Sequence, residues 1–120
     1  MLNMDNYIKI QDRIKEYIGK SAPKLVIYSA YEDGKDGSAI DNLDECPIEG
    51  KVIFIRERDS FAIGSYQSEI FENPTWLEIC GSANDSIIQT GDYHHVFLEG
   101  IYIERKEEDG VRIARLIMGS

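Results

Sequence analysis

The sequence predicts an α+β domain in which a curved, mainly antiparallel sheet of about five strands packs against an N-terminal helix and one central helix. Three observations indicate this class: two amphipathic stretches at helical spacing, five runs rich in β-branched and aromatic residues, and turn dipeptides that join neighbouring runs. A doubly wound parallel sheet would need a recurring strand–helix–strand alternation, and none occurs. The expected order is helix, strand, strand, strand, helix, strand, strand.

A first helix is expected over residues 3–19, where apolar side chains recur on one face and charged side chains fall mostly on the other. Gly19 can end this helix in the left-handed conformation, and Pro23 prevents its continuation. Residues 25–31 are rich in β-branched and aromatic side chains, so they predict a strand with both faces covered. The apolar face of the helix consists of Tyr7, Ile10, Ile14, Tyr17 and Ile18.

Residues 32–50 are expected to form an acidic connecting loop, because turn dipeptides interrupt any periodic pattern there. Residues 25–50 hold seven acidic residues and one basic residue, a net charge of 1 − 7 = −6. Carboxylates in a glycine-containing loop suit calcium, but their spacing does not follow the EF-hand pattern. We therefore expect a solvated loop that holds no metal ion.

Two strands, over residues 52–58 and 61–66, are expected to form a hairpin. Asp59 and Ser60 provide a connection short enough to turn the chain back. Gly64, inside the second of these strands, is expected to mark a bulge or a crowded backbone.

The second helix is expected over residues 74–90, with Asn73 as its N-cap, Pro74 in its first turn and Gly91 after its last turn. Its apolar stripe predicts a face that packs on the sheet, anchored by Trp76 at the helix start. The residues expected in this core are Trp76, Ile79, Cys80, Ala83 and Ile87 from the helix and Ile53, Ile55, Phe97, Ile101, Ile113 and Leu116 from the sheet.

The chain closes with a predicted hairpin, a long strand over residues 93–106 followed by a strand over 111–118, with a turn at Asp109 and Gly110. The segment DGVRIARL in this hairpin resembles the last strands of small, cone-shaped NTF2-like domains. That resemblance covers eight residues, and the strand count before the second helix departs from the family. It implies a cone whose interior can take a small molecule.

Composition and charge narrow the functional classes. The chain of 120 residues has 13 basic and 22 acidic residues, a formal net charge of −9, and is expected to form one domain over residues 1–120. Nucleic-acid binding needs a basic surface, so direct binding of DNA or RNA is not expected. No apolar run reaches the roughly 18 residues of a membrane span, and no signal sequence precedes the first helix. Cys46 and Cys80 lack disulfide or metal spacing, so we expect small buried side chains in a soluble, cytoplasmic protein.

One segment concentrates groups that can carry chemistry, because residues 91–100 hold both histidines of the chain between two carboxylates. On a strand, Asp92 and His94 would share one face about 6.6 Å apart. Asp92 would then orient the His94 ring as a general base, or the two would ligate one metal ion. Tyr66 and Tyr102, from neighbouring strands, would hold the substrate. The simpler interpretation is a structural histidine at a helix–strand junction, with no metal site and no cofactor.

Two functional hypotheses follow from these features. The first is a small acidic cytosolic binding or adaptor protein that acts through protein–protein contacts and self-associates, because an open sheet leaves edges or an apolar face to cover. In this hypothesis residues 25–50 dock on a basic surface, as a nucleic-acid mimic would. The alternative is a small-molecule-binding domain or enzyme with a pocket beside Asp92 and His94. The lack of a serine-nucleophile or phosphate-binding glycine motif favours the first hypothesis over an enzyme.

Overall fold

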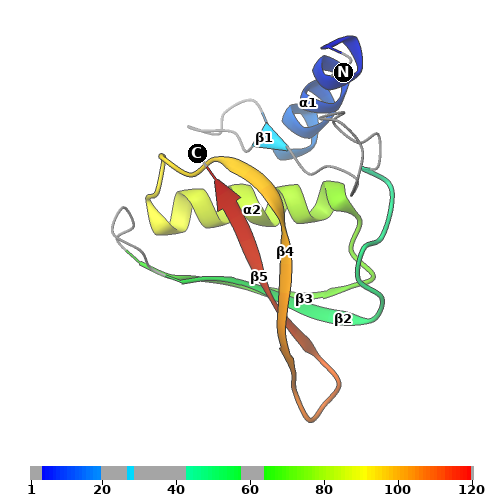
Figure 1. Cartoon of the computed structure of the whole chain (residues 1–120), viewed down its shortest axis with the longest axis vertical. Coiled ribbons are helices and arrows are strands. Elements are labelled where there is room, and N and C mark those ends of the chain that lie inside the picture. Colours follow the sequence, from blue (N-terminus) through cyan, green and yellow to red (C-terminus); the bar gives the residue numbers. More distant parts are fainter. Residues whose placement is uncertain (1–3, 20–26, 29–42, 58–63, 120) are drawn as a thin grey trace.

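Two helices and an open mixed sheet make up the part of the chain that the computed structural model describes, residues 4–19, 27–28, 43–57 and 64–119 (Figure 1). The α+β class with two helices is thus confirmed. The expected count of about five strands in a curved sheet is met only in part, because four strands are of full length and β1 contributes two residues. The elements are α1 (Met4–Ile18), β1 (Ile27–Tyr28), β2 (Lys51–Arg56), β3 (Tyr66–Glu72), α2 (Trp76–Thr90), β4 (Phe97–Lys106) and β5 (Arg112–Gly119).

The strands lie side by side in the order β1-β4-β5-β2-β3. The pairs β4–β5 and β2–β3 are antiparallel, and they hold most of the sheet's pairing. The central pair, β2–β5, is parallel, and so is the short pair β1–β4. Parallel neighbours need a crossover connection. Here β3, α2 and β4 intervene between β2 and β5, so the sheet is mixed, with antiparallel pairing dominant as expected.

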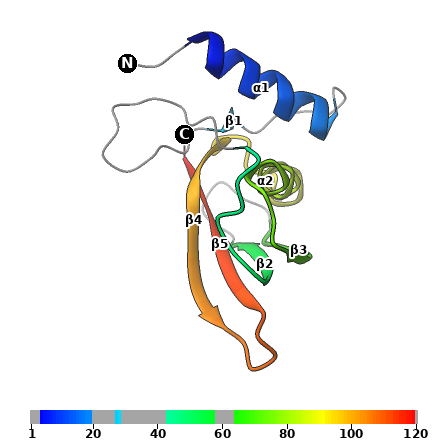
Figure 2. The same ribbon diagram turned by 90° about the vertical axis from the view of Figure 1, so that its right-hand side faces the viewer.

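Helix α2 lies in the middle of the molecule. Figure 1 shows β4 and β5 crossing in front of α2, and Figures 1 and 2 both show β2 and β3 below α2 and α1 above it. The buried apolar cluster lies around α2 and includes side chains from α1, β2, β4 and β5. One face of the sheet is therefore covered by α2. Side chains on that face contribute to the buried core, whereas side chains on the other face are not covered by a described helix.

The start of α2 differs from the prediction by two residues. Thr75, in place of Asn73, is the N-cap: its hydroxyl accepts from the backbone N–H of Glu78, whose side chain accepts from the backbone N–H of Thr75. This capping box satisfies two of the free N–H groups at the helix start. Asn73 adopts a φ of 49° and accepts instead from the backbone N–H of Gly50, 2.6 Å away, which ties the end of β3 to the start of β2. Gly91 ends the helix with a φ of 70°, as expected.

The predicted core is correct for α2 and wrong in phase for β2. Cys80, Ala83 and Ile87 are fully buried, and Trp76 is partly buried against the same cluster. On β2, however, Val52 and Phe54 face α2, whereas the sequence interpretation placed Ile53 and Ile55 there. Since paired residues of neighbouring strands share a face, Ile113, the partner of Ile53, also lies on the face away from α2, although its side chain is buried as predicted.

Two strands begin later than predicted. Strand β3 starts at Tyr66, where the predicted 61–66 strand ends, and continues to Glu72. The described residues just before it, Gly64 and Ser65, do not belong to the sheet. Strand β4 starts at Phe97 instead of residue 93. The Asp59-Ser60 turn and the remainder of the 25–31 strand beyond β1 lie outside the described residues.

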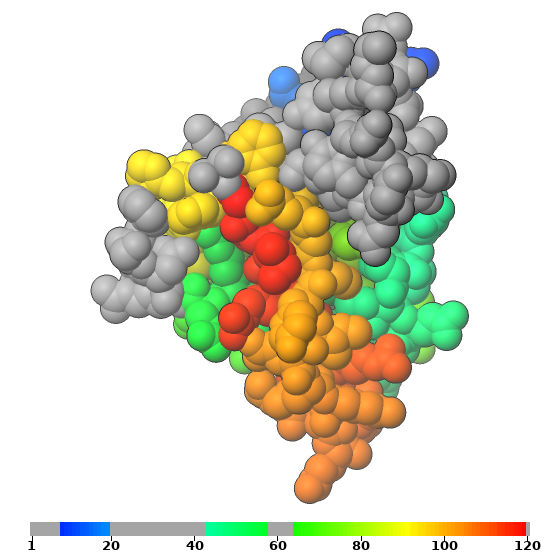
Figure 3. Space-filling model, in the orientation of Figure 1, coloured from blue at the N-terminus to red at the C-terminus, as the bar shows by residue number. Residues whose placement is uncertain are grey.

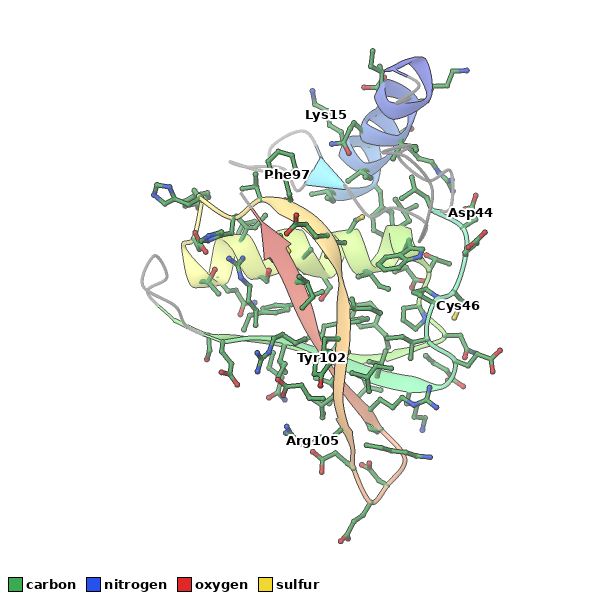
Figure 4. All side chains as sticks on the ribbon, in the orientation of Figure 1. Lys15, Asp44, Cys46, Phe97, Tyr102 and Arg105 are labelled. Atoms are coloured by element: carbon green, nitrogen blue, oxygen red, sulfur yellow. The ribbon has the colours of Figure 1, made fainter. Side chains whose placement is uncertain are left out.

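The predicted acidic loop is described only from residue 43 onward, and this part is anchored. Leu43 and Ile48 are buried in the core, and both terminal nitrogens of Arg13 donate to the carboxylate of Asp44. Cys46 is exposed, which corrects the expectation of a buried thiol (Figure 4). Its Sγ donates to the backbone carbonyl of Ile48, 2.9 Å away. Residues 32–42 of the loop lie outside the described residues.

Candidate functional site

A buried carboxylate lies between two cationic or titratable side chains at the end of the sheet. The Nη2 atom of Arg56, the last residue of β2, lies 2.5 Å from Oδ2 of Asp92. The ring Nδ1 of His95 lies 2.6 Å from the same oxygen. Asp92 is completely buried and Arg56 nearly so, whereas the His95 side chain keeps 24% of its surface exposed. We call these three residues the Asp92 cluster.

The end of α2 explains why His95, in place of His94, meets the carboxylate. After the left-handed Gly91 the chain makes a tight turn in which Oδ1 of Asp92 accepts the backbone N–H of His94 at 3.0 Å. Residues 91–96 are therefore no strand, and the predicted placement of the Asp92 and His94 side chains on one strand face is wrong. The turn brings the third following residue to Asp92, while the His94 side chain is exposed.

The charges in the Asp92 cluster favour an ionised carboxylate. Burial raises the pKa of Asp92, but three partners outweigh burial: the hydrogen bond from the His95 ring, the His94 backbone N–H and the charge of Arg56. The pKa of Asp92 therefore lies below its usual range. A buried carboxylate that stays charged needs such partners, so the cluster joins the end of β2 firmly to the α2–β4 connection.

The chemistry that the Asp92 cluster can support is that of an oriented imidazole, the ring of His95. With Nδ1 held by Asp92, the ring presents Nε2 as the group that can exchange a proton. Within the described residues no three His, Cys, Asp or Glu side chains gather closely enough to hold a metal ion.

The two tyrosines predicted to hold a substrate lie on opposite faces of the sheet. Tyr66 is buried on the α2 side, next to Arg56 in the strand register, and its hydroxyl lies 2.8 Å from the hydroxyl of Ser82. Tyr102 is 60% exposed on the other face (Figure 4). Asp92, His94, Tyr66 and Tyr102 therefore do not converge on one pocket. Cys80 offers no nucleophile either, because burial strongly raises the pKa of its thiol.

A groove does open between α2 and the edge strand β3, and the sequence interpretation missed it. Two adjoining cavities of about 390 Å³ and 160 Å³ share Glu69, Phe71 and Asp85 as lining residues. The C-terminal end of α1 closes one end of the larger cavity with Tyr17. We call this feature the α2–β3 groove; its lining residues are Tyr17, Ile18, Tyr66, Gln67, Ser68, Glu69, Phe71, Glu78, Gly81, Ser82, Asp85 and Gln89.

The α2–β3 groove has a negative potential. Burial raises the pKa of Asp85, and the negative charge of Glu69 raises it further. Burial also raises the pKa of the Tyr17 hydroxyl, with added contributions from the charges of Glu78 and Asp85. Among the described residues that line the two cavities, none is a lysine or an arginine. A group that enters this groove therefore encounters the carboxylates of Glu69, Glu78 and Asp85 together with aromatic rings.

On the face of the sheet turned away from α2, the exposed large apolar side chains are Ile70, Tyr102 and Ile117, while Ile53 and Ile55 are partly buried and Ile113 is buried. The register places Ile70, Ile53 and Ile113 in one row across β3, β2 and β5, and Ile55, Arg115 and Tyr102 in the next row across β2, β5 and β4. In Figure 3 the atoms of β4 and β5 form much of the surface toward the viewer, and no described helix lies in front of them. We call this surface the outer sheet face; its members are Ile53, Ile55, Ile70, Tyr102, Ile113, Arg115 and Ile117.

The sequence of β2 indicates two apolar strand faces but does not indicate which of them is the outer sheet face. In β2, Val52 and Phe54 lie on one face and Ile53 and Ile55 on the other. Because both faces are apolar, the sequence does not say which face α2 covers. The α2–β3 groove depends on α1 ending against Gly81, a long-range contact that no local pattern encodes: a Cβ atom at Gly81 would lie 2.9 Å from Cε1 of Tyr17.

Within the described residues, neither helix combines the length and the apolar character needed to cross a membrane. A scan against protein-family models, a search of curated proteins and a search of solved structures each found no match for this chain. The candidate surfaces are therefore weighed on their geometry and chemistry alone.

Proposed function

We propose that this chain is a protein-binding module that self-associates through the outer sheet face. One observation carries the proposal: Ile70, Tyr102 and Ile117 are 55%, 60% and 38% exposed on a sheet face that no described helix covers. Soluble monomers rarely leave contiguous apolar patches in the open, and such patches mark interaction sites. Ile53 and Ile55, both partly buried, make the patch continuous across β2.

The charges on this face suit a second copy of the chain. The chain as a whole carries a net charge of −9, so two copies repel unless the surfaces that meet are close to neutral. The outer sheet face meets this condition, because Lys51, Arg105 and Arg115 lie on it among Glu72 and Glu104. Arg115 already forms an ion pair with Glu104.

A two-fold arrangement makes these charges complementary. In a dimer with two-fold symmetry the same patch is used by both partners. An axis through the middle of the rows brings the β3 end of one copy, with Glu72, opposite the β4 end of the other, with Arg105. The apolar rows are then buried between the two sheets, and Arg105 of each copy faces Glu72 of its partner.

Sedimentation velocity over a range of concentrations tests this proposal. We expect wild-type protein to show a dimer whose share rises with concentration, and we expect Ile117→Lys to shift it to monomer because a buried lysine at the interface lacks a partner. Ile88→Lys is the matched control: Ile88 is 42% exposed, but on α2. A wild-type monomer at every concentration, or equal effects of the two substitutions, would contradict the proposal.

Small-molecule or acid–base chemistry at the Asp92 cluster is the second candidate function. It is favoured by one observation, the 2.6 Å contact that fixes the Nδ1 side of a partly exposed His95 ring. Nuclear magnetic resonance with ¹⁵N-labelled histidine and a library of small polar molecules tests it. Shifts confined to the His95 ring, lost in His95→Gln but kept in His94→Gln, would support this function, and a library without such shifts would remove it.

A further inference from the structure

The α2–β3 groove lies directly beside an open strand edge, and together these features define a second surface distinct from the outer sheet face. In the strand order β1-β4-β5-β2-β3, strand β3 is the last strand and pairs only with β2 among the described strands. Figure 2 shows β3 at the margin of the sheet, beside and below α2. The free edge of such a strand offers backbone N–H and C=O groups to an extended segment of another chain.

We propose that an extended, basic segment of a partner protein adds to the edge of β3 and inserts lysine or arginine side chains into the α2–β3 groove. The larger cavity, about 390 Å³, falls within the usual range of specific binding pockets. Alternate residues of an added strand point to the same face. A segment paired with β3 therefore directs every second side chain toward α2.

The lining of the groove selects the charge and shape of those side chains. Carboxylates stand on both walls, Glu69 on β3 and Glu78 and Asp85 on α2. Aromatic rings, Tyr17 at the α1 end and Phe71 on β3, provide surfaces for the aliphatic stem of a lysine and for a cation placed over the ring. Burial, and after it the negative charge of Glu69, raises the pKa of Asp85, and a cation placed between these two carboxylates would relieve their repulsion.

A bulge fixes where along β3 the groove opens. The pairing of β2 with β3 shifts register between Ile53 and Ile55, so Ser68 and Glu69 together lie opposite Phe54. The hydroxyl of Ser68 accepts the backbone N–H of Phe54 at 2.8 Å and donates to the carbonyl of Glu69. This irregularity turns Glu69 to the α2 side, where it lines both cavities.

Fluorescence anisotropy with a short labelled peptide of alternating lysine and threonine tests the proposal on the full chain. We expect saturable binding that disappears when glutamine replaces every lysine of the peptide. Asp85→Asn and Glu69→Gln should each weaken the affinity about fivefold or more, because each removes one carboxylate that meets the cation. Glu108→Gln is the control: Glu108 is an exposed acidic residue of the β4–β5 turn, outside both the groove and the outer sheet face, and its substitution should change the affinity by less than about twofold.

Three outcomes would overturn the proposal: equal binding of the glutamine peptide, unchanged affinity in Asp85→Asn and Glu69→Gln, or an equal loss in Glu108→Gln. If N-acetyl-lysine methylamide binds as tightly as the peptide, the groove takes a free amine and the pairing with β3 is wrong. The Ile117→Lys variant should retain peptide binding, since Ile117 lies on β5 away from the groove. Loss of self-association and loss of peptide binding are therefore separable results.

Discussion

At the scale of single residues, the side chain of Asp92 is fixed by burial and by hydrogen bonds to both of its carboxylate oxygens. It is fully buried, holds Arg56 and His95 through one oxygen, and accepts the backbone N–H of His94 through the other. Removing one partner of a buried ion pair leaves the other charge without compensation in a medium of low polarity. The role of Asp92 is therefore structural first, whatever chemistry His95 performs.

Asp92→Asn should destabilise the fold by about 3–5 kcal/mol, because Arg56 would stay buried opposite a neutral amide. Urea unfolding followed by circular dichroism measures this loss. Asp44→Asn is the control: it removes a carboxylate that also pairs with an arginine, but at the surface, so the unfolding free energy should hardly change. A loss of less than about 1 kcal/mol in Asp92→Asn would show that the buried pair does not form.

The same pair sets a pH dependence. Because the pKa of Asp92 is lowered in the folded protein, its carboxylate contributes stability that is complete above the unfolded pKa of about 3.9 and is lost as the pH falls through the folded value. The difference in unfolding free energy between wild type and Asp92→Asn should therefore narrow as the pH is lowered from about 6 toward about 2.5. A difference that stays constant over this range would contradict the assignment.

At the scale of elements, the contact between α1 and α2 depends on a glycine inside a helix. Alanine is favoured over glycine in a helix interior by about 1 kcal/mol, yet a Cβ atom at Gly81 would lie 2.9 Å from the Tyr17 ring. Gly81→Ala should therefore stabilise the protein by about 1 kcal/mol only in a Tyr17→Ala background, and less or not at all in the wild type. Denaturant unfolding of the four proteins gives this coupling; the same effect of Gly81→Ala in both backgrounds would mean that the ring does not pack there.

The elements also show what the sequence could and could not predict. Helix α1 and strand β5 were predicted within a residue or so, because helical spacing and the Asp109-Gly110 turn are local signals. Strand β3 was displaced because the bulge at Ser68 and Glu69 breaks its alternation. The phase of β2 was wrong because both of its faces are apolar, and only the position of α2 decides which of them is covered.

The candidate site was predictable only as a neighbourhood. Asp92 and the two histidines stood out as a local cluster, but the partner that keeps the carboxylate charged, Arg56, is 36 positions away in the chain. His95, and not His94, contacts Asp92 because the chain turns after Gly91. The sequence interpretation placed residues 93–96 in a strand and therefore did not include this turn. The site thus depends on the long-range pair between Arg56 and Asp92 and on the turn after Gly91, and neither of these can be read from local composition.

At the scale of the whole molecule, the net charge of −9 gives the two proposed surfaces opposite responses to salt. Self-association brings two acidic molecules together over a nearly neutral, apolar face, so screening their repulsion should strengthen it. Binding of a basic peptide in the α2–β3 groove is driven by attraction between opposite charges, so the same salt should weaken it. Sedimentation and anisotropy at about 0.05 M and about 0.5 M sodium chloride compare the two; a parallel response would mean that one of the two surfaces is wrongly assigned.

The central claim, that two copies meet through the outer sheet face, is tested most directly by isotope-filtered nuclear Overhauser spectra of a mixed sample. One half of the protein carries labelled isoleucine methyl groups, and the other half is unlabelled. The predicted result is a set of intermolecular signals from the methyl groups of Ile70, Ile55 and Ile117, including contacts to a tyrosine ring that vanish in Tyr102→Ala. Intermolecular signals from Ile8 or Ile88 on the helices, or no such signals at concentrations where sedimentation shows a dimer, would contradict the claim.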